Sequence, residues 1–237
     1  MVAPNSNKAD RSVQAVERTV AILDAFLKTE SPLSLGELAE QSKLFKSVVS
    51  RYLLTLVPRG YINIRSDGRY EPGPKLYELG CRFANNQDLS QLILPTLEAL
   101  VDQTQESASF YIRDGESRIC LFRKDSPHPI KASIAPGTRM PLDDSATAQV
   151  LRTFKTQSVT SWDIQSCIFV SSFALNDITK KLLPTVSVSA PLCYRDGSFA
   201  GALTISGPPI RFEPSNPSVQ QLLIKVAQEL SAQLISP

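Results

Sequence analysis

The sequence has a single histidine, His128, which lies between two prolines. A metal site built from several histidines is therefore excluded. Because His128 lies in a loop between two prolines, we also exclude a histidine-based catalytic triad. The chain also lacks a P-loop and a GxGxxG motif, so the common nucleotide-binding loops are absent. We predict that the protein is not an enzyme and has no catalytic residue, no metal and no cofactor. A hydrolase that uses only carboxylates and serine is the one catalytic alternative left open.

The four cysteines, Cys81, Cys120, Cys167 and Cys193, are far apart and form no CxxC pair. This spacing is typical of reduced, buried, small apolar residues in a cytosolic chain, and a redox-sensing role is the alternative. No apolar run approaches the ~20 residues that a membrane-spanning helix needs. Residues 1–11 are polar and lack the apolar core of a signal peptide. We expect a cytoplasmic protein that does not enter a membrane, with residues 1–11 as a flexible arm.

The segment from Ser34 to about Ser42 carries a strong helix-start signal. Ser34 and Glu37 have the spacing of a capping box, in which each side chain hydrogen-bonds the amide of the other residue. Leu33 and Leu38 occupy the two positions of a hydrophobic staple. These features predict a short helix that begins at Ser34.

A second helix is predicted after a tight turn, and Pro58 and Gly60 end it. Its apolar residues recur at i, i+4 and i+7, which predicts that Val49, Leu53 and Leu56 are buried. The other face carries short polar or basic side chains, namely Lys46, Ser47, Ser50, Arg51 and Thr55.

A hairpin is predicted directly after this helix. Residues 61–65 alternate polar and apolar side chains, Asp67-Gly68 is a turn signal, and residues 69–71 form the return strand. Two helices joined by a tight turn and followed by a two-stranded ribbon make a winged helix-turn-helix. In such a domain the second helix enters the major groove of DNA, and the ribbon lies along a flanking groove.

Positive charge is concentrated in this region. Residues 41–75 carry seven Lys or Arg against two acids, a local charge of +5, whereas the whole chain has a net charge of +2. A phosphate backbone would lie against such a surface. The alternative is a solvated basic face on an ordinary helical hairpin.

The predicted DNA contacts follow from position along the second helix. Lys46 and Ser47 in its first turn are placed for phosphate, and Ser50 and Arg51 are candidates for base edges, with a phosphate contact as the alternative for Arg51. The remaining predicted contacts are Thr55 on the same helix, Arg65 and Arg69 on the ribbon, and Arg11 in the arm, which either reaches DNA or stays in solvent.

A further helix is predicted before the helix-turn-helix, over about residues 13–28. Its expected buried stripe is Val16, Val20, Leu23 and Leu27. These residues would complete a three-helix core.

Several short motifs occur in a characteristic order along the chain: residues 12–18, residues 33–39, Lys46-Ser47 with Val49 and Arg51, residues 59–61, residues 67–70, residues 73–76, residues 127–129, residues 203–208 and Arg211-Phe212. Together they resemble the IclR family of bacterial transcriptional regulators. The resemblance implies an α+β protein with a winged helix-turn-helix at residues 12–72, a linker and dimerisation helix at residues 73–88, and a GAF-like antiparallel-sheet effector domain at residues 89–237. It also implies a homodimer, or a dimer of dimers, on a double-stranded DNA operator.

The second half of the chain alternates helix and strand patterns. A helix from about Leu89 carries Leu92, Leu97, Leu100 and Val101, and hairpins are predicted over residues 107–124 and 186–206. Residues 130–134 are predicted to form a short strand. Asp143 or Asp144 is expected to cap a helix that runs to about Phe154. The last helix, from about Ser215, has an apolar stripe made of Val219, Leu222, Leu223, Val226, Leu230 and Leu234.

The resemblance places a small organic effector, a carboxylate or an aromatic acid, in a pocket over the sheet. The matching positions are Ala146 and Thr147 at a helix start and Thr204 and Ser206 on the last strand. The alternative is that Thr204 and Ser206 only satisfy hydrogen bonds at an edge of the sheet. Asp143 stands where the family favours His, and we expect its charge to repel an anion. The segment near residues 152–169 is shorter than in the family, and residues 171–177 lack its acidic pattern, so the pocket is expected to be altered.

We therefore predict a DNA-binding transcriptional regulator, a repressor or an activator, controlled by a small organic ligand of a catabolic pathway. One alternative is a DNA-binding regulator whose second domain only oligomerises. Another is a cytosolic small-molecule-binding or catalytic protein whose winged helix contacts proteins. The slope of affinity against salt distinguishes DNA binding from protein contact.

Overall fold

The computed structural model describes residues 12–85, 89–132, 134–155, 159, 161–171 and 185–236. The chain divides into two compact units, with the boundary between Phe83 and Ala84. Among the described residues, no helix combines the length and the apolar character needed to cross a membrane.

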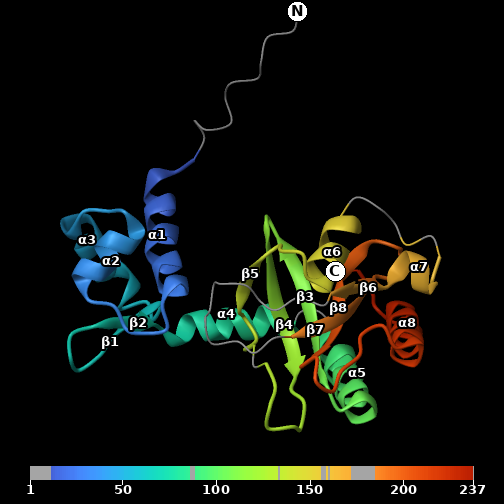
Figure 1. Cartoon of the computed structure of the whole chain (residues 1–237). Helices are drawn as coiled ribbons and strands as arrows, with labels where there is room; N and C mark the ends of the chain where they lie inside the picture. Colours follow the sequence, from blue (N-terminus) through green and yellow to red (C-terminus); the bar gives the residue numbers. More distant parts are fainter. Residues whose placement is uncertain are drawn as a thin grey trace, which may run out of the picture. The chain divides into compact units, whose positions relative to one another are not determined.

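Up to residue 72, the N-terminal unit consists of helices, a short 3-10 turn and a hairpin (Figure 1). Its elements are α1 (Gln14–Ala25), η2 (Phe26–Lys28), α2 (Leu35–Ser42), α3 (Lys46–Leu56), β1 (Ile62–Ile64) and β2 (Tyr70–Pro72). Buried side chains from α1, α2, α3 and β1 form one core, which includes Ile22, Leu38, Leu53 and Ile62. The order of two helices, a tight turn and a ribbon is that of a winged helix-turn-helix.

The predicted start of α2 is confirmed. The Ser34 hydroxyl accepts the Glu37 amide at 3.3 Å, and the Glu37 carboxylate accepts the Ser34 amide at 2.7 Å. Leu33 and Leu38, the two staple residues, are both buried. The turn between α2 and α3 is made by Lys43, which has a left-handed φ of 57°, and by the bond from the Leu44 amide to the Ala39 carbonyl.

The predicted stripe of α1 is wrong at three of its four positions, and only Leu23 packs against the core, half-buried. Val16, Val20 and Leu27 are exposed, and the buried residues are instead Ile22 and Ala25, with Phe26 in the following turn. The helix also ends at Ala25 rather than at Lys28, because residues 26–28 tighten into a 3-10 turn. The helix has two apolar stripes, and only its packing on α2 decides which one is buried.

The hairpin prediction is confirmed, with a loop of residues 66–68 between its strands. Ile62 pairs with Pro72 and Ile64 pairs with Tyr70. The Arg65 amide donates to the Arg69 carbonyl, and Gly68 has a φ of +80° that L side chains rarely adopt. Tyr70 also exchanges two backbone hydrogen bonds with Leu33, which ties the hairpin to the start of α2.

Helix α4 (Pro74–Asn85) begins against the hairpin. The Gly73 amide donates to the Tyr61 carbonyl at 2.8 Å, and a Cβ on Gly73 would lie only 2.2 Å from the Gly60 carbonyl oxygen. Glycine is therefore required where the chain leaves the ribbon. The predicted linker residues Leu79 and Phe83 are exposed on α4, as is Tyr77.

The C-terminal unit contains a six-stranded antiparallel sheet in the order β5-β4-β3-β8-β7-β6. The strands are β3 (Ser107–Asp114), β4 (Ser117–Lys124), β5 (Arg139–Pro141), β6 (Phe169–Ser171), β7 (Val186–Cys193) and β8 (Phe199–Gly207). Both predicted hairpins, β3–β4 and β7–β8, are confirmed. This unit is α+β, as predicted.

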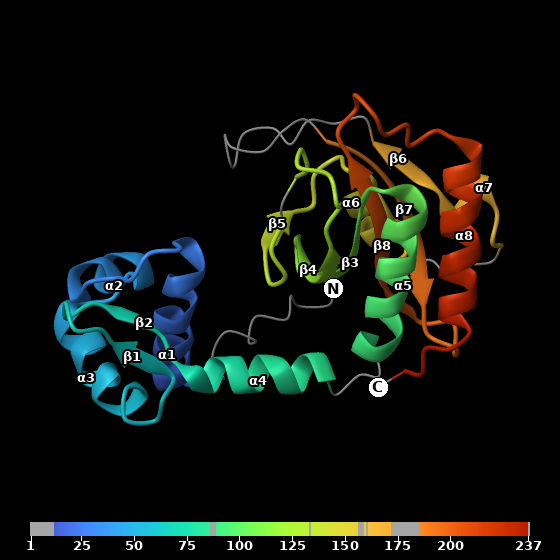
Figure 2. The ribbon, with the colours of Figure 1, turned by 90° about the horizontal axis from the view of Figure 1, so that it is seen from below.

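Helices cover the sheet on both faces. Helices α5 (Leu89–Thr104) and α8 (Pro217–Ser231) lie side by side on one face (Figure 2). Their buried side chains pack on apolar strand residues that include Leu203 and Ile205 of β8. Helix α6 (Ala146–Thr153) packs on the other face, near Tyr111 and Ala202. The alternation along β8 thus sends Leu203 and Ile205 to the main core and sends Ala202, Thr204 and Ser206 to the α6 side.

Several details of this unit differ from the predictions. The described residues of the range 130–134 are not in a strand, and the sheet edge is instead formed by β5. The cap of α6 is Ser145, whose hydroxyl accepts the Ala148 amide, and is neither Asp143 nor Asp144. Helix α8 begins at Pro217 behind an Asn216 cap, two residues after the predicted start. Its stripe also shifts, because Ile224 and Ala227 are buried while Val219, Leu222 and Val226 are half-buried.

Cysteine burial follows the prediction at three positions. Cys120, Cys167 and Cys193 are buried, whereas Cys81 is half-buried. Burial raises the pKa of Cys120 to about 11 and that of Cys193 to about 11. These two thiols are therefore protonated near neutral pH, and thiols are poor nucleophiles.

Candidate functional site

The polar face of α3 is open to solvent. Val49, Leu53 and Leu56 hold the opposite face of the helix in the core, so the helix can present only one side outward. The predicted DNA-binding residues of this helix are all exposed, and they are Lys46, Ser47, Ser50, Arg51 and Thr55. The arrangement suits the major groove of DNA, which admits one α-helix.

The two arginines of the hairpin have different surroundings. Arg65 lies 3.4 Å from the Glu71 carboxylate and 3.9 Å from the Asp67 carboxylate, so its charge is partly balanced. Arg69 donates to the Pro32 carbonyl at 3.4 Å, and its charge also acts on the Glu37 carboxylate. Carboxylates therefore lie near both arginines. The predicted contact at Arg11 lies outside the described residues.

Phe45 is an exposed apolar residue for which the sequence predicted no role. It caps the N-terminus of α3 without a side-chain hydrogen bond, and its side chain is 82% exposed. A large aromatic ring at this position lies beside the predicted phosphate contact of Lys46. The sequence does show this feature, because the apolar residue Phe45 directly precedes the polar first turn of α3.

The second site lies on the α6 face of the sheet, where hydroxyl side chains form two rows across the strands. In the first row Ser109 pairs with Thr204, and Thr204 pairs with Ser189. In the second row four serines, Ser107, Ser206, Ser187 and Ser171, oppose one another across β3, β8, β7 and β6. Directly opposed residues share a face. Among the described residues no buried side-chain nitrogen or oxygen lacks a hydrogen-bond partner, so these rows form a satisfied polar layer beneath α6.

The predicted effector residues meet at this surface with one exception. The Thr147 and Thr204 hydroxyls are 2.9 Å apart, and Thr204 also lies 2.8 Å from the Ser189 hydroxyl. The side chain of Ala146 is fully buried and does not line the cavity. Strand β8 lies inside the sheet between β3 and β7, so Thr204 and Ser206 are not at a sheet edge, although the Thr204 hydroxyl does satisfy hydrogen bonds, as the alternative expects.

A small cavity of about 50 Å³ lies over these hydroxyls. Its lining includes Tyr111, Arg118, Ser145, Thr147, Thr204 and Ser206. Burial raises the pKa of Tyr111 to about 12, so its phenol is neutral and can donate a hydrogen bond. The start of α6 supplies backbone amides at the same place, which favours an anion.

Asp143 does not act as the repulsive charge that the sequence suggested. Its carboxylate accepts hydrogen bonds from both terminal nitrogens of Arg118, and Nη2 lies 3.1 Å from Oδ2. Burial raises the pKa of Asp143, but the hydrogen bonds from Arg118 and Ser145 outweigh this effect and leave the pKa below its usual value. Both groups of the pair are therefore ionised and their charges cancel. The prediction failed because Arg118 lies on β4, 25 residues away in the sequence.

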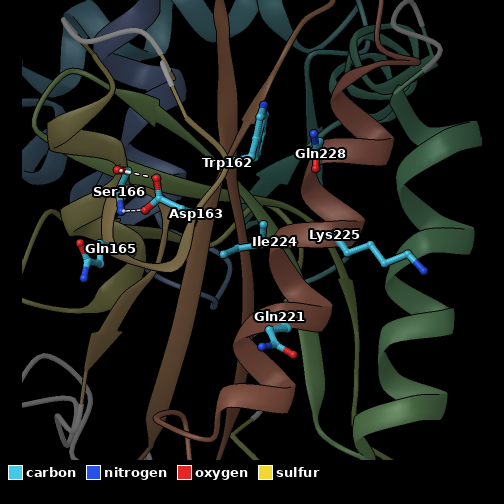
Figure 3. Close-up of a pocket in the computed structure, with 8 residues that line it drawn as sticks. All are labelled: Trp162, Asp163, Gln165, Ser166, Gln221, Ile224, Lys225 and Gln228. Carbon is cyan, nitrogen blue, oxygen red and sulfur yellow. Dashed lines mark hydrogen bonds between the residues drawn. The ribbon is translucent and has the colours of Figure 1, made fainter.

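A more open groove of about 560 Å³ lies on the other side of the unit (Figure 3). It runs between α8 and the segment that holds Trp162 and α7 (Ile164–Cys167). Its one carboxylate, Asp163, already accepts the Ser166 amide at 2.8 Å and two serine hydroxyls. Lys225 extends away from Asp163 (Figure 3) and is exposed. Despite its size, this groove offers fewer convergent polar groups than the small cavity.

Among the described residues, no group of three or more His, Cys, Asp or Glu side chains is placed to hold a metal ion.

Comparison with known proteins identifies both units. Residues 15–63 match the sequence model of the IclR helix-turn-helix domain. Residues 81–167 match that of the C-terminal domain of the bacterial transcriptional regulator IclR. The chain belongs to the IclR family of transcriptional regulators.

Relatives across the IclR family span nearly the whole chain. The HTH-type transcriptional regulator BhcR of Paracoccus denitrificans is 26% identical, covering 92% of this chain and 86% of that protein. The HTH-type transcriptional regulator KdgR of Escherichia coli is 25% identical, with coverage of 99% and 97%. These relatives are named as regulators, which are generally not enzymes.

Solved structures of the IclR family share the fold. Pseudomonas aeruginosa HmgR matches with a TM-score of 0.73 at 20% identity, covering 94% of this chain and 100% of that chain. An IclR homolog from Microbacterium hydrocarbonoxydans, crystallised with 4-hydroxybenzoate, matches with a TM-score of 0.72 at 16% identity, with coverage of 92% and 98%.

Two buried arginines of this IclR protein escaped the sequence reasoning. Arg118 and Arg123 lie on β4, and both point to the α6 side of the sheet, where Arg123 donates to Ser109 at 2.8 Å. The two arginines flank the apolar run Ile119–Phe122, next to Ser117 and Lys124, so the strand pattern alone predicts that they face solvent. Only the covering loops and α6 show that they are buried.

Proposed function

We propose that this IclR-family protein binds a double-stranded DNA operator as a homodimer and responds to a small organic acid. The observation that carries the DNA part is the exposed polar face of α3, held in one orientation by its buried opposite face. Lys46 and Ser47 would contact phosphate, and Ser50 and Arg51 would reach base edges. Thr55, Arg65 and Arg69 would add contacts along the groove, and we extend this proposal to Arg11.

The dimer is supported by the apolar side chains that α4 leaves exposed. Tyr77, Leu79 and Phe83 lie uncovered on this helix, and a second copy of the chain would bury them. A two-fold dimer also matches two operator half-sites one helical turn apart. Control by the ligand would then be a coupling free energy, in which effector and operator favour different arrangements of the dimer.

The effector class is proposed from the chemistry of the cavity. Hydroxyls of Thr147, Thr204 and Ser206, the amides at the start of α6 and the Arg118 guanidinium all favour a carboxylate. The family member that was crystallised with 4-hydroxybenzoate supports an organic acid as the class. We therefore propose a carboxylate, aliphatic or aromatic, as the effector.

The experiment that tests the DNA part is fluorescence anisotropy on an operator selected from a random-sequence pool. Arg51→Ala is expected to cost about 1–3 kcal/mol and to relax specificity at one base pair. Lys46→Ala should weaken all sequences equally and reduce the salt slope by about 1. Lys225→Ala, which removes an exposed lysine of α8, is the matched control and should change neither value. Failure to enrich any sequence, or indifference to Arg51→Ala, would refute the proposed recognition helix.

Phe45 provides a second test on the same operator. Because its ring is exposed at the start of α3, we expect it to contact the methyl group of a thymine in the major groove. Replacing that thymine by deoxyuridine should weaken binding of the wild type by about 0.8 kcal/mol, roughly fourfold. Phe45→Ala should weaken binding to the thymine operator and should remove the difference between thymine and deoxyuridine. An equal loss for both proteins at every thymine would rule this contact out.

A further inference from the structure

The Arg118–Asp143 pair is asymmetric in a way that matters for ligand binding. The Arg118 side chain is 4% exposed and projects from the interior of β4, whereas the Asp143 side chain is 35% exposed and lies in the connection between β5 and α6. A buried guanidinium cannot be left without a partner at low cost, but a carboxylate at the surface can move into water. The arginine is thus the permanent member of the pair, and the aspartate is the replaceable one.

Arg118 also borders the cavity. Arg118 and Ser145 both line it, together with the hydroxyls of Thr147 and Thr204, whereas Asp143 pairs with Arg118 from outside this lining. A ligand carboxylate in the cavity would therefore compete with the Asp143 carboxylate for the same guanidinium. A ligand that replaced Asp143 would preserve the charge balance around the buried guanidinium, because one carboxylate would take the place of another.

We propose that Arg118 binds the anionic head group of the effector and that Asp143 holds this position when the effector is absent. This inference rests on the proposed effector function and makes it more specific. The cavity is small, about 50 Å³, so we take a short aliphatic carboxylate rather than an aromatic acid as its ligand.

The exchange would act directly on the start of α6. Asp143 Oδ1 accepts the Ser145 amide at 3.0 Å, and Arg118 hydrogen-bonds the Ser145 hydroxyl. That hydroxyl caps α6 by accepting the Ala148 amide at 3.3 Å. Release of Asp143 would thus free the connection that leads into α6, while the bond from Thr147 to Thr204 keeps the helix on the sheet. Binding of a carboxylate at Arg118 would therefore change the connection between β5 and α6.

The test uses acetate as the probe and acetamide, its neutral analogue, as the control at equal ionic strength. The thermal unfolding midpoint of the full chain is measured for the wild type, Asp143→Ala, Asp143→Asn and the double variant Arg118→Gln with Asp143→Ala. Both single variants remove the competing carboxylate, so acetate should stabilise them and acetamide should not. Their apparent affinity for acetate should exceed that of the wild type by about tenfold, since an occupied site lowers apparent affinity by its competent fraction.

Two results would overturn the inference. The first is the absence of selective stabilisation by acetate in the Asp143 variants. If Asp143→Ala does not fold, Asp143→Asn, which keeps the side-chain volume, is the variant that decides. The second is equal stabilisation of the double variant, because that would place the anion away from Arg118.

Operator binding by the same proteins separates this inference from the proposed function. Stabilisation of Asp143→Ala by acetate without a change in operator affinity would support the Arg118 site and refute effector control. A carboxylate that changes the operator affinity of the wild type and of Arg118→Gln equally would support effector control and refute the role of Arg118.

Discussion

Arg211→Ala is expected to lower the free energy of unfolding of the C-terminal unit by about 3–5 kcal/mol. Arg211 forms a two-point ion pair with Glu106, with Nε 2.6 Å from Oε1 and Nη2 3.0 Å from Oε2. The Glu106 side chain is only 4% exposed, so removal of the arginine leaves a buried carboxylate without its partner. Urea unfolding followed by the fluorescence of Trp162, the sole tryptophan, reports on this unit alone.

Arg139→Ala is the matched control for this prediction. Arg139 also pairs with a carboxylate, that of Asp114, but the two side chains are 44% and 58% exposed. Exposed ion pairs contribute about 0–1 kcal/mol. Equal losses for the two variants would show that burial does not set the value of the Glu106 pair.

Leu53→Ala is expected to destabilise the N-terminal unit by about 2–5 kcal/mol and to reduce operator binding with it. The Leu53 side chain is 4% exposed and lies in the core that orients α3, so its removal leaves a cavity beneath the recognition helix. Hydrogen exchange of the α3 amides measures this loss, because they would exchange faster while those of α5 would not.

Leu54→Ala provides the control on the same turn of α3. Leu54 is 75% exposed, and the same truncation there is expected to change stability by less than about 0.5 kcal/mol. A similar increase in exchange for both variants would mean that helix propensity, rather than core packing, holds α3 in place.

Local signals were sufficient for much of the N-terminal unit. The capping box at Ser34 and Glu37, the buried stripe of α3 and the turn at Gly68 each depend on residues within a few positions of one another. Such signals survive in sequence because the interactions that cause them are equally local. They placed the recognition helix and its exposed side chains correctly.

Other features depended on which surfaces meet. Helix α1 has apolar residues on more than one side, and its packing on α2 buries Ile22 and exposes Val16. The edge strand β5 forms at residues 139–141 because β4 offers a partner there, not because of a strong strand pattern. Periodicity identifies an amphipathic element but does not name its partner.

By itself the sequence determined a winged helix-turn-helix followed by an α+β unit, and its resemblance to the IclR family implied Ala146, Thr147, Thr204 and Ser206 as candidate effector contacts. Only the tertiary structure decided that Asp143 is neutralised rather than repulsive, because its partner Arg118 comes from β4. The same holds for the Glu106–Arg211 pair, whose members are 105 residues apart. Ion pairs between distant segments leave no periodic trace in the sequence, since each partner's role depends on a contact that exists only after the chain has folded.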